Sequence, residues 1–369
     1  MTTRDEAGEV EQPGGELAVT GRVTIYDVAR AAGVATSTVS RALSQPGRVS
    51  YQTAEHVRDI AGRLGYHALR VERSLPEQRT ALLAIVVADI ANPVFHGMIR
   101  GAERTAVDAG YTMLMVETQE SEPSERQALE RVVPAVDGIV LTSSRMPDSA
   151  IRDLAKRKPT VVLNRIVSRV ASVATDNVKA VKQVAELLGA AGHRFVTYLS
   201  GPEASWADGM RWRGVREAGY ESELKVRRIG PLLPTMRGGT SAAETWAQHP
   251  TSAVIAYNDL VAIGFIQAVR RAGYRVPEDV SVVGFDNIVE CTLIEPHLTT
   301  VAAPLVSLGS AAVSHLLRSS QRPVGDHDQL LVLPPRLVIR ESTGPPTSRR
   351  EGHSAAGSED DLSTSAAAD

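Results

Sequence analysis

The stretch VTIYDVARAAGVATSTVSRAL, residues 23–43, holds two short helical patterns that meet at Gly33. Apolar residues recur in each pattern at the spacing of one helical face. They are Ile25, Val28, Ala29 and Ala32 in the first pattern, and Val34, Val39, Ala42 and Leu43 in the second. Gly33 suits the left-handed turn between them, because a residue with a Cβ resists that conformation. The stretch therefore predicts two helices joined by a tight turn.

The polar residues of this stretch predict where the first helix begins and which face of the second is exposed. Thr24 is suited to capping the first helix, and Asp27 lies near the positive end of that helix. The second helix leaves four residues facing outward: Thr36, Ser37, Ser40 and Arg41. A helix-turn-helix with such a small, polar second face is typical of a DNA reader. An αα-hairpin in a protein core has the same spacing.

Charge favours the DNA interpretation. Residues 21–80 contain nine arginines, five acidic residues and no lysine, whereas the whole chain has a formal net charge of −3. A basic module in an acidic chain indicates a local polyanionic partner. Ser50 is suited to capping a third helix, residues 51–64, which completes a helix-turn-helix domain over residues 22–66. Residues 67–80 are expected to form a hinge or linker.

Length and composition limit the remaining possibilities. A chain of 369 residues is expected to hold more than one domain. Residues 1–21 and 343–369 lack periodicity, and we expect a disordered leader and a disordered tail. The single cysteine, Cys291, excludes an intramolecular disulfide and is expected to be a buried structural thiol. The sequence contains no secretory signal and no run of about 18 apolar residues, so we expect a cytoplasmic protein.

From residue 81 to residue 342, short apolar strands alternate with helices. This rhythm predicts parallel sheets that are covered on both faces. The first run of expected strands is 81–88, 111–117, 137–143 and 160–164, and the second is 194–200, 224–229, 252–257 and 279–285. Late strands at 298–302, 330–334 and 336–340 are placed to cross back between lobes. The predicted fold class is α/β, an all-α headpiece followed by a two-lobed doubly wound core.

Open parallel sheets bind ligands outside the carboxyl ends of their strands. The residues after the expected strands that are suited to ligand contact are Asp89, Phe95, Arg165, Trp206, Arg211, Asn258 and Asp286. Their charged and amide groups can bond hydroxyls or carboxylates, and the two aromatic rings offer flat faces to a sugar ring or base.

Some of these residues have structural alternatives. Asn258 precedes an expected helix, so capping explains it as well as ligand contact does. Trp206 fits a core equally well. For Arg211 and Asp286 the ligand interpretation is favoured, because a charged side chain in a cleft needs a partner.

Enzyme motifs are absent from the sequence. It contains no GxGxxG after a strand, no GxxxxGK[ST], no HExxH and no GxSxG. We therefore expect no enzymatic activity, no cofactor and no metal site.

Several stretches, in order, resemble the LacI/GalR family of bacterial transcriptional regulators over residues 23–343. Residues 23–43 are similar to the DNA-binding signature of that family, and VPEDVSVVGFDNI, residues 276–288, is similar to a signature of its core. ANPVFHGMIRGAE, AYNDLVAIG and LTTV fit the same family. The resemblance implies a core like periplasmic sugar-binding proteins. It also implies a homodimeric repressor of a pseudo-palindromic DNA operator, controlled by a small-molecule effector for which a sugar is the expected class. A solute-binding protein with the same core is the alternative, which the basic headpiece disfavours.

The resemblance also implies roles for individual residues. Residues that reach base edges would be Thr36, Ser37 and Arg41, and residues that hold phosphates would be Thr24, Tyr26, Thr38, Ser40, Ser50 and Thr53. Leu75 would enter the minor groove as an apolar wedge. The implied effector contacts are the strand-end residues named above, apart from Trp206. The chain departs from the family at Ala35, where a capping serine is usual, and in the hinge at Ala68, Leu69 and Glu72.

Overall fold

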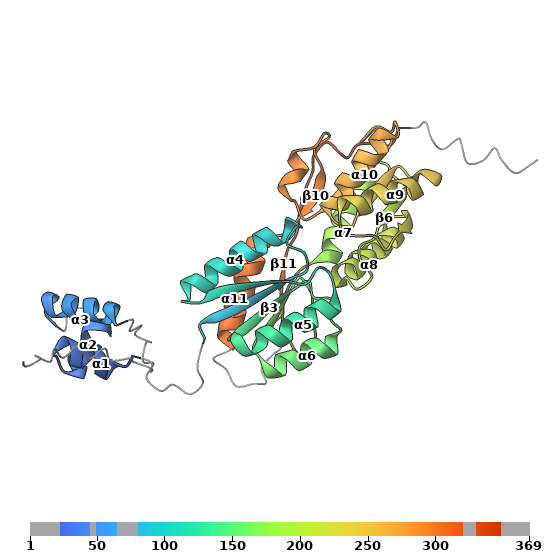
Figure 1. The fold of residues 1–369 in the computed structure, drawn as a ribbon. Coiled ribbons are helices and arrows are strands. Elements are labelled where there is room, and N and C mark those ends of the chain that lie inside the picture. Colours follow the sequence, from blue (N-terminus) through green and yellow to red (C-terminus); the bar gives the residue numbers. More distant parts are fainter. Residues whose placement is uncertain (1–22, 45–48, 65–79, 320–329, 348–369) are drawn as a thin grey trace, which may run out of the picture. The chain divides into compact units, whose positions relative to one another are not determined.

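The computed structural model describes residues 23–44, 49–64, 80–319 and 330–347. The chain divides into two compact units, Met1–Gln78 and Arg79–Asp369, and each is described by itself (Figure 1). Within the described ranges, no helix combines the length and the apolar character that crossing a bilayer requires.

The first unit is a three-helix headpiece, formed by α1 (Ile25–Ala32), α2 (Thr36–Ser44) and α3 (Tyr51–Arg63). Gly33 has a φ of 63°, which confirms the left-handed turn. The buried core combines Val28, Ala29, Ala32, Val39 and Ala42 from the two predicted apolar faces with Ala54, Val57 and Ala61 of α3. The headpiece therefore has the helix-turn-helix arrangement that the spacing predicts.

The second unit contains two lobes, each built on a six-stranded sheet with helices on both faces (Figure 1). The strands of the first lobe are β1 (Leu82–Val87), β2 (Thr112–Glu117), β3 (Gly138–Thr142), β4 (Thr160–Leu163), β5 (Ala171–Thr175) and β11 (Leu330–Leu333). Its helices are α4 (Val94–Asp108), α5 (Glu122–Val132), η1 (Val133–Ala135), α6 (Asp148–Arg157) and α11 (Leu305–Ser319). All its strand pairs are parallel, in the order β11-β5-β4-β3-β1-β2.

The second lobe repeats this design. Its strands are β6 (Phe195–Leu199), β7 (Lys225–Ile229), β8 (Ala253–Ala256), β9 (Ser281–Phe285), β10 (Thr299–Ala302) and β12 (Arg336–Val338). Its helices are α7 (Asn177–Ala190), α8 (Trp206–Glu221), α9 (Met236–Gln248), α10 (Asp259–Arg271) and η2 (Val289–Thr292). The order is β12-β10-β9-β8-β6-β7, with only the β10–β12 pair antiparallel among the described strands.

The sequence pattern did not reveal one strand, β5. Its sequence, ASVAT, has few large apolar residues, yet all five residues are buried between β4 and β11. The chain crosses to the second lobe after β5, returns after β10 to form α11 and β11, and crosses again to β12. The predicted crossing by the late strands is confirmed.

Glycines allow one helix pair in each lobe to pack backbone to backbone. A Cβ on Gly101 of α4 would lie 2.0 Å from the carbonyl oxygen of Val306 in α11. A Cβ on Gly239 of α9 would lie 2.0 Å from the carbonyl oxygen of Val261 in α10. In both lobes, a glycine therefore lets one helix of the pair pack closely against the backbone of the other.

The core continues past its predicted end at residue 342. The Gly344 carbonyl accepts hydrogen bonds from His193 Nε2 (2.9 Å) and Ser281 Oγ (3.0 Å), and Thr347 Oγ1 donates to the Glu278 carbonyl (2.7 Å). Residues 343–347 are therefore bonded to the second lobe rather than part of a disordered tail.

Candidate functional site

The carboxyl ends of the strands in the two lobes meet around two small cavities of about 20 Å³ and about 10 Å³. Together these are lined from the first lobe by Asn92, Val94, Phe95, Met98, Glu120, Ser143, Arg145, Asn164, Thr175, Ala303 and Leu305. The second lobe contributes Asn177, Ala180, Arg211, Pro234, Tyr257, Asn258, Phe285, Asp286 and Val301. Chain order reverses between β1 and β3 in one sheet and between β6 and β8 in the other, which is where open sheets form ligand sites.

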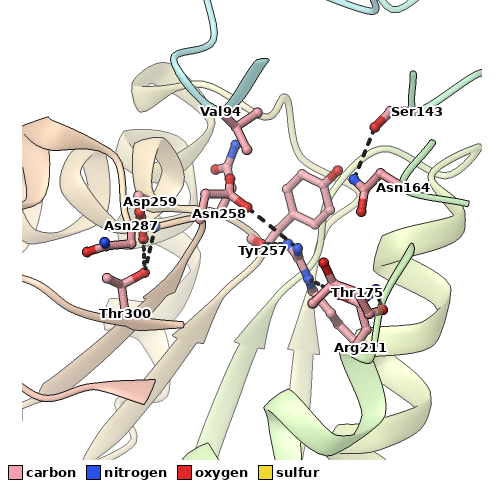
Figure 2. Close-up of polar contacts among 12 residues, drawn as sticks. Val94, Ser143, Asn164, Thr175, Arg211, Tyr257, Asn258, Asp259, Asn287 and Thr300 are labelled. Atoms are coloured by element: carbon pink, nitrogen blue, oxygen red, sulfur yellow. Dashed lines mark hydrogen bonds and ion pairs between the residues drawn. The ribbon is translucent and has the colours of Figure 1, made fainter. Parts of the chain in front are cut away.

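Backbone strain gathers at the same strand ends. Ser143 (φ 54°) follows β3, Asn164 (φ 60°) follows β4, and Asp286 (φ 113°) and Asn287 (φ 57°) follow β9. Residues with a Cβ rarely adopt positive φ, and such strain is concentrated at ligand sites. Asn164 Nδ2 donates to Ser143 Oγ at 3.1 Å, which fixes two of these residues against each other (Figure 2).

Arg211 lies at the centre of the site, one turn into α8. Its Nε donates to Asn177 Oδ1 at 3.0 Å. One Nη donates to the Tyr257 carbonyl (Figure 2). The guanidinium also lies against the rings of Phe285, at 4.3 Å, and Tyr257, at 5.2 Å. These contacts hold the cation in place at the cavity wall.

Asp286 faces Arg211 across 3.6 Å, longer than a hydrogen bond. Burial raises the pKa of Asp286 well above its usual range; the Arg211 charge opposes this shift, and repulsion from Asp259 adds to it. Asp259 is itself buried and accepts from Thr300 Oγ1 at 2.6 Å, from Ile288 N–H at 3.0 Å and from Cys291 Sγ at 3.1 Å. The sequence therefore placed Arg211 and Asp286 correctly at one cavity. The prediction that Cys291 is a buried structural thiol is also consistent with its complete burial.

Asn258 caps a helix, as one of its two interpretations predicts. Its Oδ1 accepts from the Val261 N–H at 2.9 Å, and its Nδ2 donates to the Pro234 carbonyl at 3.0 Å. Asn258 also lines the larger cavity, so its cap places the amide at the cavity wall. Phe95 lines the same cavity from the first turn of α4.

Two further predicted ligand residues make hydrogen bonds within their own lobe. Arg165 donates from Nη1 to the carbonyls of Ser144 (2.8 Å) and Met146 (2.7 Å), and from Nη2 to Asp148 at 2.6 Å. Asp89 accepts from the Ala91 N–H at 2.8 Å within a tight turn. Neither lines the two cavities. Trp206 is half-buried and lines, together with Arg165, a further cavity between loops of the two lobes.

The sequence reasoning missed Arg145 and Tyr257, which both line the larger cavity. Arg145 comes three residues after β3 and Tyr257 comes directly after β8, so the strand-end rule applies to both. Two serines separate Arg145 from the end of β3, and Tyr257 belongs to an apolar run that predicts a strand over residues 252–257.

In the headpiece, the outward-facing residues of α2 are exposed as predicted for Ser37, Ser40 and Arg41, and Thr36 is half-buried. Tyr26 is exposed and Thr38 half-buried. Thr24 donates its hydroxyl and its N–H to Asp27 Oδ2, at 2.6 and 2.8 Å, which lowers the pKa of Asp27. Leu75, Ala68, Leu69 and Glu72 lie outside the described residues.

Two further headpiece residues have capping roles. Ser50 Oγ accepts from the Thr53 N–H at 3.2 Å at the start of α3, and the hydroxyls of the two residues lie 2.7 Å apart. At the start of α2 the Ala35 carbonyl accepts from Thr38 and Val39, but alanine has no side-chain oxygen for the cap.

Comparisons with known proteins match both units. Residues 24–68 match the model for bacterial regulatory proteins of the lacI family, and residues 185–343 match that of a periplasmic binding protein-like domain. The repressor CytR of Escherichia coli strain K12 is 31% identical over 336 residues, covering 87% of this chain and 96% of CytR. The regulator DegA of Bacillus subtilis strain 168 is 30% identical, covering 88% of this chain and 99% of DegA.

A solved structure of the transcriptional regulator CelR in complex with cellobiose is 28% identical. It has a TM-score of 0.65 and covers 87% of this chain and 100% of CelR. CytR and DegA thus match this chain along most of its length, across both units and in the same order. The chain belongs to the LacI family of bacterial regulatory proteins.

Proposed function

We propose that this LacI-family regulator is a repressor whose affinity for operator DNA is set by a small molecule bound between the lobes of its core. The observation that carries the proposal is the strand-end site, where Arg211, Asn258 and Asp286 from the second lobe face Phe95 and Asn164 from the first. The same chain contains a helix-turn-helix, and its affinity for DNA is what the bound small molecule would control. Cellobiose in the CelR complex supports a sugar as the effector class.

The size of the site indicates how binding would be coupled to movement. Ligand pockets usually measure roughly 300–1,000 Å³, whereas the larger cavity here measures about 20 Å³. The lobes therefore have to separate before a sugar can enter. A ligand that favours one spacing of the lobes shifts the population toward it, and that differential affinity is the allosteric coupling.

A homodimer is part of the proposal. A pseudo-palindromic operator presents two half-sites, which a two-fold symmetric dimer reads together. In the first lobe the edge strand β2 exposes Leu114 (40%) and Met115 (44%). An exposed apolar edge strand is a pairing surface, and we assign it to a second copy of this chain.

The DNA contacts are proposed for the outward face of the headpiece. Ser37 and Arg41 are exposed on α2 and are positioned to reach base edges with Thr36. Tyr26 is exposed on α1 and is assigned to a phosphate. Phosphate roles are also proposed for Thr24, Thr38, Ser40, Ser50 and Thr53, and a wedge role for Leu75. A DNA-bound repressor would act in the cytoplasm, and the proposal includes no enzymatic step.

Operator binding and effector response are tested on the full chain. Selection from random duplexes should yield a pseudo-palindrome, and its binding should weaken steeply as salt rises, because counterions are released from the phosphates. Absence of any selected sequence would contradict the proposal. A thermal-shift screen of sugars should then find a ligand, which stabilises by about 2.7 kcal/mol at 100 times its dissociation constant.

Arg211 provides the variant that separates the two activities. Arg211→Met should abolish the response of operator binding to that ligand, while operator binding itself persists through the separate headpiece. Arg131→Met, which removes an exposed arginine of α5, is the matched control and should respond as the unmodified protein does. An unchanged response in Arg211→Met would exclude the proposed role of this residue.

A further inference from the structure

Arg145, at the carboxyl end of β3, has no role in the site as described so far. Its side chain is 5% exposed, yet it lines the larger cavity between the lobes. A buried guanidinium requires partners, and the identity of those partners decides what the group can still bind.

The first lobe holds Arg145 rigidly. Glu120 Oε2 accepts from Nε at 2.6 Å and also contacts Nη2. The Arg145 N–H donates to Oε2 of the buried Glu125 at 2.9 Å. One edge of the guanidinium fork is thus fixed to Glu120, which positions the cation in advance for a ligand.

A second guanidinium faces the same cavity from the other lobe. Arg211 and Arg145 both line it, and Tyr257 lies between their lobes. The Tyr257 carbonyl accepts from Arg211, and its phenol group interacts with Arg145. An anion bound between the two arginines would be attracted to both lobes at once and would draw them together.

The carboxylates at this cavity compensate the two arginines unequally. Glu120 contacts Arg145 closely, whereas Asp286 remains 3.6 Å from Arg211. Burial also raises the pKa of Asp286, which acts in the same direction as the 3.6 Å separation and weakens its pairing with Arg211. Arg211 therefore lacks the close carboxylate contact that Arg145 makes with Glu120, and an anionic group of a ligand can supply that contact.

We propose that Arg145, acting with Arg211 from the opposite lobe, selects an effector that carries an anionic group, a carboxylate or a phosphate, on a polyhydroxylated molecule. This inference rests on the proposed function, because it specifies the ligand of the same site. Arg145 is then the residue of the first lobe that determines specificity.

The test measures binding to the full-length protein by calorimetry, using matched probes. D-glucuronate against D-glucose tests a carboxylate, and D-ribose 5-phosphate against D-ribose tests a phosphate. At least one anionic probe should bind more tightly than its neutral partner. Arg145→Gln should weaken that binding at least about tenfold, the equivalent of one charge-assisted hydrogen bond.

Three further variants separate specificity from folding. Arg145→Lys keeps the positive charge but lacks the paired N–H donors of a guanidinium. It should bind the anion with an affinity between those of the unmodified protein and Arg145→Gln. Glu120→Gln removes the competing carboxylate and should tighten anion binding, a gain that damage to the fold cannot produce. Arg131→Gln removes an exposed charge from the same lobe and should change nothing.

The outcomes are distinct. Tighter binding of neutral probes, equal anion binding by Arg145→Gln, or no binding of any anionic probe overturns the proposal. Operator binding by the same preparation is measured in parallel: if it persists, only the anionic specificity is overturned, and if it is also absent, the proposed function fails with it.

Discussion

The two lobes place an edge strand at the same position of their sheets, β2 in the first lobe and β7 in the second. The exposed side chains of these strands differ in kind. β2 exposes Leu114 and Met115, whereas β7 exposes Lys225 and Arg228. Charged residues on an edge strand prevent pairing with another chain, and apolar residues invite it. The same architecture thus has one edge suited to a partner and one edge protected from it.

A second contrast separates the arginines of the two lobes. Arg165 uses its Nη groups on the Ser144 and Met146 carbonyls and on Asp148, all in its own lobe. Arg211 is held by Asn177 and Tyr257 but faces the cavity and the weakly paired Asp286. The first lobe thus uses Arg165 to hold a loop, whereas the second lobe holds Arg211 at the wall of the cavity.

The largest expected effect concerns the feature that the two lobes share. Gly101→Ala and Gly239→Ala each place a Cβ 2.0 Å from a carbonyl oxygen, so the paired helices must separate. Each should lower the free energy of unfolding by about 2–4 kcal/mol, measured by urea denaturation.

Gly189→Ala in α7 is the control for these two variants, because no other described residue beyond its chain neighbours and its own helix backbone lies within 4 Å of the added Cβ. It should stabilise the protein by about 0.5–1 kcal/mol, since alanine is favoured over glycine in a helix. A tolerated substitution at only one of the two packed glycines would show that the lobes do not share this packing.

The next effect concerns the difference between the edges. Leu114→Lys combined with Met115→Arg gives β2 the character of β7, and in a homodimer the added charges of both copies face each other. The dissociation constant of the dimer should rise about 100-fold, equivalent to about 2.7 kcal/mol, as measured by sedimentation.

Lys225→Leu on β7 is the matched control and should leave the dimer dissociation constant unchanged. An unmodified protein that sediments as a monomer, or a double variant that dimerises normally, would refute the assignment of β2 to a second copy. The thermal midpoint of each variant verifies that the lobes remain folded.

A third effect concerns the buried acids of the second lobe. Because the pKa of Asp286 is raised on folding, the folded state keeps a proton that the unfolded state releases. Protonated Asp286 therefore contributes to the free energy of unfolding at low pH, and this contribution is lost as the pH rises from about 4 through the raised pKa. Asp259, with a pKa of about 6, adds a similar loss at lower pH.

Asp286→Asn should therefore remove the decline in the free energy of unfolding between about pH 6 and pH 8. Each unit of pKa shift corresponds to about 1.4 kcal/mol, so urea denaturation at several pH values can detect the change. Asp153→Asn is the control, because this exposed acid has a lowered pKa and titrates below that range. A decline that persists in Asp286→Asn would mean that other groups cause it.

The sequence predicted the headpiece in detail, because its signals are local. Helical spacing identified the core residues of the headpiece, and Gly33 adopts the left-handed turn that its lack of a Cβ allows. Alternation of apolar strands and helices predicted every strand of the core except β5, which forms between β4 and β11 although its own residues are small.

The site was predictable in its location but not in its contacts. The strand-end rule identified Arg211 and Asp286, because parallel strands bring their carboxyl ends to one edge wherever the helices lie. It could not distinguish Arg165, whose partners are backbone carbonyls that no sequence pattern marks. It also missed Arg145, which two serines separate from the end of β3 and whose partner Glu120 is 25 residues away in the chain.

The sequence by itself determined the helix-turn-helix, the doubly wound core and the family, because each is marked by residue spacing and composition within short stretches of the chain. Only the tertiary structure decided which charged groups face one another. Ion pairing and burial depend on distances between residues far apart in the chain. The Arg145–Glu120 pair, the 3.6 Å separation of Arg211 and Asp286, and the exposed β2 edge are therefore properties of the folded lobes.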